Sequence, residues 1–255
     1  MKQENIVIQV KNLYAGYNHT PIIENINFEI FQGEIFVILG GSGCGKSTLL
    51  KHMIGLLPPI SGDAIILGDN ICTAHGQEKN LILQKIGVAF QSGALFGSMT
   101  VMENIMLPLK EFTHLPISAM EEIARIKLKL VGLENSVFLM PGELSGGMKK
   151  RAALARAMAL DPSIIFLDEP SAGLDPITSA ELDQLIIDLA QSLGITFVIV
   201  THELDSIESI AHRVIMLEKL SKSIIATGAP SELKKDKSNP YVYNFFNRII
   251  EKSVK

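Results

Sequence analysis

An octapeptide near the start of the chain, Gly40-Gly41-Ser42-Gly43-Cys44-Gly45-Lys46-Ser47, has the residue types and spacing of a phosphate-binding loop. Its glycines let several backbone N–H groups point at one spot, and the positive end of a following helix strengthens the attraction for an anion. Lys46 can reach the β- and γ-phosphates of a nucleotide as a point charge, and the Ser47 hydroxyl can ligate magnesium. The loop therefore predicts a nucleotide-binding site.

Two acidic side chains, Asp168 and Glu169, follow an apolar run at 163–167 that has the length of a buried strand. Asp168 is placed to hold magnesium, usually through its water shell. Glu169 is the candidate general base for a water that attacks the γ-phosphate, because a neighbouring carboxylate can orient that water and accept its proton. Alternatively, the two acids cap a helix N-terminus. The phosphate loop in the same chain favours the catalytic interpretation.

Two further polar residues follow predicted strands. Gln91 comes directly after 86–90, where its amide can reach a metal or a water, and His202 comes just after 195–200, where it can contact a γ-phosphate. A glutamine or a histidine after a strand is more often structural than catalytic. Beside Lys46 at the same sheet edge, both are predicted to take part in hydrolysis.

A second anion site is predicted at Ser145-Gly146-Gly147, directly before the Ala- and Arg-rich helix former 149–157. Ser145 is a good N-cap, and the N–H groups of Gly146 and Gly147 would be exposed at the helix end. Alone, this segment would be interpreted as a flexible turn.

The elements that position these residues follow from the hydrophobic pattern. Segments 6–10 and 26–30 alternate as half-buried strands around a turn-rich stretch that carries Tyr17, an aromatic that could stack on adenine or simply pack on the surface. The apolar run 35–39 is predicted as the strand before the phosphate loop, and a helix is expected at 48–54 after it.

Two helical regions are expected later in the chain. Segment 92–143 contains Pro108 and Pro116 together with apolar residues at helical spacing, and it is predicted as a helical insertion. The tail is predicted to form an amphipathic helix that docks either on its own domain or on a second subunit. The residues taken as the apolar face of the insertion are Ile123, Ile126, Leu130 and Leu133, and those of the tail are Val242, Phe245, Phe246, Ile249 and Ile250.

Composition excludes several classes of function. The chain has 255 residues, 47% hydrophobic composition and a net charge of −4, which suits one α/β unit with an inserted lobe and argues against a nucleic-acid-binding surface. Two cysteines suggest no disulfide framework, and we interpret Cys44 as a small filler of the loop. The N-terminus lacks signal-peptide features and no run approaches the length of a membrane span, so a cytosolic protein is expected.

The order of these motifs resembles the nucleotide-binding subunit of ATP-binding cassette (ABC) transporters, and the resemblance covers nearly the whole chain. It implies an α/β P-loop NTPase of ABC type, with a mostly parallel sheet core, an N-terminal antiparallel β subdomain and an inserted helical subdomain. The implied core is 1–91 with 146–228, the helical subdomain is 92–145, and the C-terminal extension is 229–255. The implied ATP-binding residues are Tyr17, Gly40, Gly41, Ser42, Gly43, Cys44, Gly45, Lys46, Ser47 and Thr48.

The resemblance also implies an assembly. ATP would lie between the phosphate loop of one subunit and the signature residues Ser145, Gly146 and Gly147, together with Asp175, of a second copy, in a homodimer. Catalysis would rest on Glu169, His202, Gln91 and Lys46, with magnesium held by Ser47, Gln91 and Asp168. The expected partners are integral-membrane permease subunits and accessory or lipid-binding subunits, with no nucleic acid. The chain would sit at the cytoplasmic face of the inner membrane.

Local sequence narrows the resemblance. Met148 stands where most of the family has Gln, and Gly41 where Pro or Asn is commoner. Met148 and the segment 91–96 are similar to the ATPases of Mla-type phospholipid and Mce-linked lipid transport systems. Lipid transport is therefore expected, and the alternative is an importer of a polar solute such as an amino acid.

Overall fold

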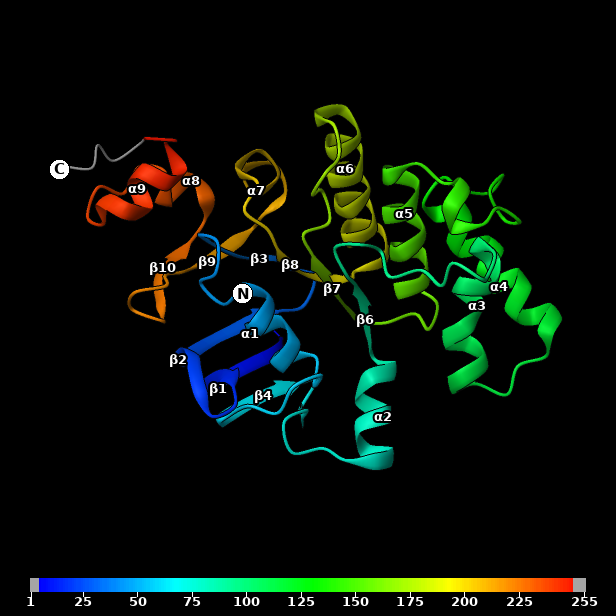
Figure 1. Cartoon of the computed structure of the whole chain (residues 1–255), viewed down its shortest axis with the longest axis horizontal. Helices are drawn as coiled ribbons and strands as arrows, with labels where there is room; N and C mark the ends of the chain where they lie inside the picture. The colour runs from blue at the N-terminus through cyan, green and yellow to red at the C-terminus, as the bar shows by residue number, and fades with distance from the viewer. Residues whose placement is uncertain (1–4, 250–255) are drawn as a thin grey trace. The chain divides into compact units, whose positions relative to one another are not determined.

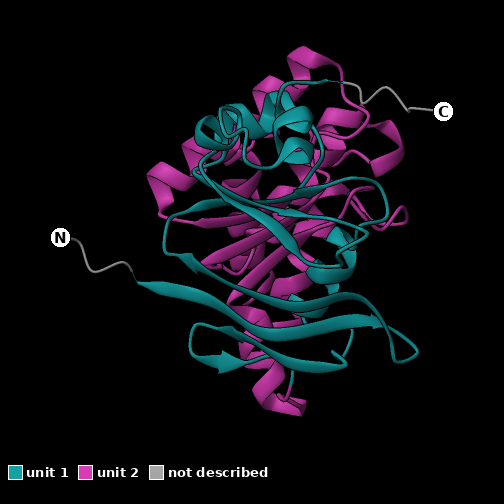
Figure 2. Cartoon of the chain, turned by 90° about the vertical axis from the view of Figure 1, so that its left-hand side faces the viewer, with its two compact units in different colours: residues 1–72, 200–255 teal, residues 73–199 magenta. Residues whose placement is uncertain are grey.

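The computed structural model describes residues 5–249 of the chain. They fall into two compact units (Figure 2): unit 1 contains residues up to Cys72 and from Val200 onward, and unit 2 runs from Thr73 to Ile199. The domain boundaries expected at residues 92 and 145 differ from these limits and stay a prediction.

Unit 1 begins with an antiparallel sheet of order β2-β1-β4-β5. Its strands are β1 (Ile6–Tyr17), β2 (Thr20–Phe31), β4 (Ser61–Ile66) and β5 (Asp69–Asn70). Tyr17 is the last residue of β1, so its predicted place on a loop was wrong. The turn consists of Asn18 and His19, whose φ values of 49° and 63° suit a two-residue hairpin.

The second part of unit 1 is built on β3 (Ile35–Gly40), every residue of which is buried. β3 pairs in parallel with β9 (Arg213–Leu217), and β10 (Ile224–Gly228) pairs antiparallel with β9. Helix α1 (Lys46–Met53) follows β3 after a short loop (Figure 1). The strand, loop and helix expected around the phosphate loop are therefore present.

The C-terminal part of unit 1, as far as residue 249, contains the short helices α7 (Leu204–Ile210), α8 (Pro230–Leu233) and α9 (Pro240–Phe246). Val242 and Phe246 of α9 are buried, and the Asn247 side chain donates to the Lys234 carbonyl at 2.8 Å, which ties α9 to α8. The tail helix therefore docks on its own unit. Its predicted extent was too long, because α9 stops at Phe246 and Ile249 is 49% exposed; Ile250 lies outside the described residues.

Unit 2 has three strands in the order β8-β7-β6: β6 (Ile86–Ala89), β7 (Ile164–Asp168) and β8 (Thr196–Val200), which ends at the unit boundary. β6 and β7 are parallel. Unit 2 also contains the helices α2 (Gly76–Gln84), α5 (Gly146–Ala157) and α6 (Pro176–Leu193) (Figure 1). A methyl group built on Gly87 would lie 2.3 Å from the Ala157 carbonyl oxygen, so α5 packs directly on the backbone of β6.

The predicted helical insertion is present as α3 (Val101–Phe112), α4 (Ile117–Leu130) and a 3₁₀ turn at Pro141–Glu143. The face of α4 was predicted wrongly, since Ile126 is 56% exposed while Met120, Ala124 and Leu128 are buried. The small Ala124 marks the buried stripe, and a search for large apolar residues passes over it. Within the described range, no helix is long and apolar enough to cross a bilayer.

Candidate active site

The phosphate loop of unit 1 depends on glycine where the backbone turns. Gly40, Gly43 and Gly45 have positive φ values of 147°, 75° and 102°, a backbone conformation that residues other than glycine rarely adopt. A methyl group on Gly45 would also lie 2.6 Å from Cγ2 of Ile23, and one on Gly40 would lie 2.3 Å from the Leu217 carbonyl oxygen. The loop is therefore pressed between β2 and β9 in a conformation that only glycine fits well.

Lys46 lies within this loop. Its ammonium group donates to the carbonyl oxygens of Gly40 at 2.9 Å and Gly41 at 3.2 Å, and the residue is 9% exposed. The N-cap of α1 is Gly45, which has no side chain to accept from the first turn of N–H groups. A cation, a curled backbone and a helix start without a capping side chain together fit a phosphate group.

Cys44 has the role predicted for it. Its side chain is 1% exposed, and burial raises the pKa of its thiol despite the nearby charge of Lys46. A neutral, enclosed thiol fills space in the loop and is a poor nucleophile.

His202 lies in the same unit as the loop. The Thr201 N–H donates to the Ile38 carbonyl at 3.3 Å, which fixes the segment beside β3 two residues before Gly40, and His202 is exposed there. The fold thus supports the predicted closeness of His202 to the loop.

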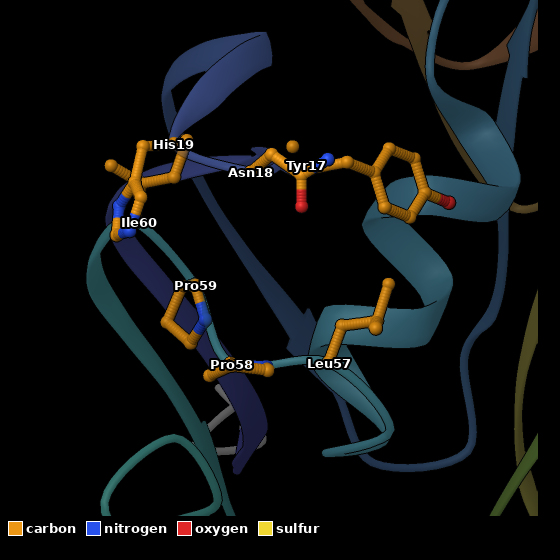
Figure 3. A pocket seen from close by; sticks show the side chains of 8 residues that line it. Tyr17, Asn18, His19, Leu57, Pro58, Pro59 and Ile60 are labelled. Atoms are coloured by element: carbon orange, nitrogen blue, oxygen red, sulfur yellow. The ribbon is translucent and has the colours of Figure 1, made fainter.

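Tyr17 is 43% exposed and lines a surface pocket of about 350 Å³. Figure 3 shows Tyr17 and Leu57 on one side of this pocket, with His19, Pro59 and Ile60 on the other. An exposed ring at a strand end is available for stacking on a base.

In unit 2, the predicted catalytic residues follow two adjacent parallel strands. Asp168 is the last residue of β7, and Glu169 follows with a φ of 49° and 9% exposure. Gln91 is exposed and comes two residues after β6, rather than directly at its end as predicted. Since β6 and β7 pair as Ala89 with Leu167, Gln91 and the two acids share one edge of the sheet.

Lys150 connects these two segments, and sequence reasoning gave it no role. Its ammonium group donates to the Gln91 carbonyl at 2.6 Å and to the Glu169 carbonyl at 2.9 Å. Its place in the basic run 149–151 was the available signal, but a run of charges on a helix ordinarily indicates a solvated face.

The segment predicted as a second anion site has the expected N-cap, but Gly147, which was expected to be exposed, is buried. The Ser145 hydroxyl caps α5 by accepting from the Met148 N–H at 3.2 Å, and both Ser145 and Gly146 are exposed. Gly147 is buried, and a methyl group there would lie 2.5 Å from Cγ2 of Thr178. The start of α5 therefore packs closely against the start of α6.

Asp175 caps α6, a role that the sequence analysis did not assign. Its carboxylate accepts from the N–H groups of Ile177 and Thr178, both at 3.1 Å, and from the Thr178 hydroxyl at 2.6 Å. The hydroxyl and then the amide hydrogen bonds from Thr178 lower the pKa of Asp175, so the carboxylate is held ionised. Pro176 at the first helical position was the signal for this cap.

The donors proposed for magnesium are a hydroxyl, an amide and a carboxylate, all of them oxygen ligands that magnesium prefers. Residues 5–249 contain no cluster of three or more His, Cys, Asp or Glu side chains that could hold a metal without other help. A magnesium ion here would rely on nucleotide phosphates as well, which is its usual mode in phosphoryl-transfer sites.

The structure therefore groups the predicted residues into two sets. Unit 1 contains Tyr17, the phosphate loop and His202. Unit 2 contains Gln91, Asp168, Glu169, Asp175 and the Ser145–Gly147 cap. The first set offers phosphate and base contacts, and the second offers a carboxylate base and a further helix N-terminus.

Comparisons with known proteins agree with this arrangement. A protein-family model described as "ABC transporter" matches residues 23–172. The chain is 40% identical over 227 residues to the intermembrane phospholipid transport system ATP-binding protein MlaF of Haemophilus influenzae, covering 89% of this chain and 85% of that protein. It is 42% identical over 242 residues to the probable ribonucleotide transport ATP-binding protein mkl of Mycobacterium leprae, covering 95% and 69%.

Among solved structures, the ATP-binding cassette MJ0796, a dimer in a post-hydrolysis state bound to ADP and Pi, is 31% identical with a TM-score of 0.79. The match covers 87% of this chain and 98% of that one. The expected fold class is thereby confirmed. The chain belongs to the ABC transporter family, as an ATP-hydrolysing nucleotide-binding subunit.

Proposed function

We propose that this chain powers the transport of phospholipid between membranes through a separate permease, at the cytoplasmic face of the membrane to which that permease holds it. The observation that carries the proposal is the 40% identity to MlaF along 89% of the chain. The resemblance of 91–96 and Met148 to Mla-type ATPases, inferred from the sequence, points to the same function. The absence of a membrane-crossing helix from the described part of the chain agrees with a peripheral subunit.

The catalytic unit is a homodimer with ATP between two copies. Lys46 and the loop N–H groups bind the β- and γ-phosphates from one copy, and the start of α5 at Ser145, Gly146 and Gly147 binds the γ-phosphate from the other. Two observations support this arrangement: the exposed, capped start of α5, and the dimeric state of the related cassette MJ0796.

The remaining site residues position the attacking water, neutralise the negative charge of the phosphate groups and bind the adenine ring. Glu169 accepts the proton of the water, and its buried position keeps bulk solvent from competing for that proton. His202 donates a hydrogen bond to the γ-phosphate. Ser47, Gln91 and Asp168 would hold magnesium, which would supply positive charge next to the phosphate oxygens. Tyr17 stacks on the adenine ring.

The residue assignment is tested by Glu169→Gln. We expect turnover to fall by roughly 10²–10⁴-fold, the range for a lost general base, while ATP affinity is retained and closed dimers accumulate in sedimentation. Glu122→Gln, on the exposed side of α4, is the matched control and should leave turnover unchanged. Normal turnover of Glu169→Gln would remove Glu169 from the role of base.

A second candidate cargo is a polar solute, because the mkl relatives, at 42% identity, are described as probable ribonucleotide transport proteins. The two cargoes are distinguished by purifying the tagged full chain from detergent-solubilised membranes and identifying bound subunits and lipids by mass spectrometry. Co-purification of a permease that carries phospholipid supports the proposal. A permease that retains nucleotides or amino acids, without phospholipid, would overturn it.

A further inference from the structure

Helix α5 holds the segment after β6 with side chains from two different turns. Arg156 donates to the carbonyl oxygens of Ala94 at 2.7 Å and Gly93 at 3.0 Å, and Lys150 donates to that of Gln91 at 2.6 Å. Gly93 has a φ of 76°, and a methyl group there would lie 3.3 Å from the Lys149 carbonyl oxygen. Segment 91–94 therefore lies directly against α5 and is fixed to it by three charge-assisted hydrogen bonds.

Lys150 differs from Arg156 because its ammonium group also reaches a second strand end. It donates at 2.9 Å to the carbonyl of Glu169, the residue that follows β7. Glu169 has a φ of 49°, a left-handed conformation that residues with side chains adopt at a cost, so surrounding contacts must hold it. The bond from Lys150 is one such contact, and it acts on the peptide group that sets the direction of the Glu169 side chain.

We infer that Lys150 is a positioning residue for ATP hydrolysis, which ties the backbones of Gln91 and Glu169 to the helix whose N-terminus carries Ser145–Gly147. This inference rests on the proposed roles of Gln91 and Glu169. Helix α5 begins at the turn proposed to bind the partner's ATP, and Lys150 lies one helical turn later. If α5 shifts when that ATP binds, Lys150 moves with it and pulls on the carbonyl groups of Gln91 and Glu169. Helix α5 thereby connects two sites: the Ser145–Gly147 turn, which binds the ATP of the partner subunit, and Gln91 and Glu169, which act on the ATP bound by this chain's own phosphate loop.

The alternative is that Lys150 merely helps the loop to fold. A folding role would lower stability, and ATP binding and turnover would change together. A positioning role changes the chemical step while ATP affinity stays nearly constant, because the main binding groups lie in the phosphate loop. The two roles therefore differ in how a substitution divides its effect between kcat and affinity.

The experiment uses the full chain with Lys150→Met and Lys150→Arg, and Lys149→Met as the control. Lys149 is the neighbouring cation on α5 and has the same charge. Steady-state ATPase activity, equilibrium binding of a fluorescent ATP analogue and thermal unfolding are measured for each variant. We expect Lys150→Met to lower kcat by about 10²-fold, the effect of a misplacement of ~1 Å, with affinity within about threefold of the unsubstituted chain.

Lys150→Arg should recover most of the kcat, because a guanidinium group has donors for both carbonyls. In a Glu169→Gln background, Lys150→Met should cause little further loss, because both substitutions act through the same carboxylate. Lys149→Met should retain full turnover. If Lys150→Met does not fold, Lys150→Arg is compared with Lys150→Gln, whose side chain is shorter and uncharged. We expect a higher kcat for Lys150→Arg, and equal values would contradict the inference.

Three results would overturn the inference: an unchanged kcat in Lys150→Met, an equal loss in Lys149→Met, or full additivity with Glu169→Gln. Its failure is distinguishable from failure of the proposed function. If Glu169→Gln lowers turnover by roughly 10²–10⁴-fold and Lys150→Met leaves it unchanged, the proposed function stands and the positioning role falls. If Glu169→Gln has no effect, the assignment of the base falls.

Discussion

The contact between Gly147 and Thr178 allows a sharp test of how α5 meets α6. In Gly147→Ala, the new methyl group would lie 2.5 Å from Cγ2 of Thr178, well inside normal contact distance. Thr178 cannot easily turn away, because its hydroxyl donates to Asp175 at 2.6 Å. Overpacking of this kind costs about 1–3 kcal/mol, and the better helix propensity of Ala offsets at most about 1 kcal/mol.

A second substitution isolates the clash. Thr178→Ser removes the offending methyl group and keeps the hydroxyl that bonds to Asp175. The next contact of the methyl group added by Gly147→Ala, with Cβ at position 178, is at 4.0 Å and is an ordinary one. In the Thr178→Ser background, Gly147→Ala should therefore be neutral or slightly stabilising, so the sign of its effect depends on one carbon atom.

The assay is thermal unfolding of the four variants of this cycle, followed by far-ultraviolet circular dichroism. With a net cost in the middle of this range, about 1–2 kcal/mol, and roughly 2–4 °C per kcal/mol for a chain of this size, Gly147→Ala alone should lower Tm by about 2–8 °C. When Thr178→Ser is also present, Gly147→Ala should raise Tm or leave it constant. An equal decrease in both backgrounds would refute the packing argument and would mean that Gly147 is required for another reason.

Three further predictions concern unit 1. A methyl group on Gly41 would lie 3.2 Å from the Tyr241 hydroxyl oxygen, so Gly41→Ala should weaken binding of a fluorescent ATP analogue severalfold. Adding Tyr241→Phe removes that oxygen and should restore binding. If binding is not restored, α9 does not restrict the loop. Burial raises the pKa of Cys44, so the folded protein keeps this thiol neutral up to a higher pH than the unfolded chain does. The free energy of unfolding should therefore decrease as pH rises from the ordinary thiol range through that raised pKa. Near pH 8, alkylation followed by mass spectrometry should label Cys44 far more slowly in the folded protein than in urea, and more slowly than the half-buried Cys72; faster labelling of Cys44 in the folded state would contradict this.

Local chemistry made much of the site predictable. Ser145 has a capping side chain before two glycines and a strong helix former, and the structure shows the expected cap. The octapeptide from Gly40 to Ser47 implied a strand before it and a helix after it, because its glycines permit a sharp turn between them. Asp168 followed an apolar run and is the last residue of a buried strand. In each case the signal lies within a few residues of the feature.

Features that depend on distant segments were predicted poorly. The turn between β1 and β2 was predicted too long, because the two strands stay paired as far as Tyr17 and Thr20. The buried face of α4 includes Ala124 and excludes Ile126, which depends on how closely neighbouring elements approach. The role of Lys150 was missed because its two acceptors are backbone carbonyls, 59 and 19 positions away, and a carbonyl leaves no mark in the sequence.

The parallel pairing of β3 with β9 has a consequence for biosynthesis. The Ile35 amide bonds to the His212 ring across 177 positions of sequence, and β9 covers the edge of β3 that precedes the phosphate loop. At synthesis rates of about 5–20 residues per second, the ribosome needs roughly 10–35 s to supply that partner strand. During this interval the buried strand 35–40 has an unsatisfied hydrogen-bonding edge, so the nascent chain should depend on ribosome-associated chaperones until its last fifth emerges.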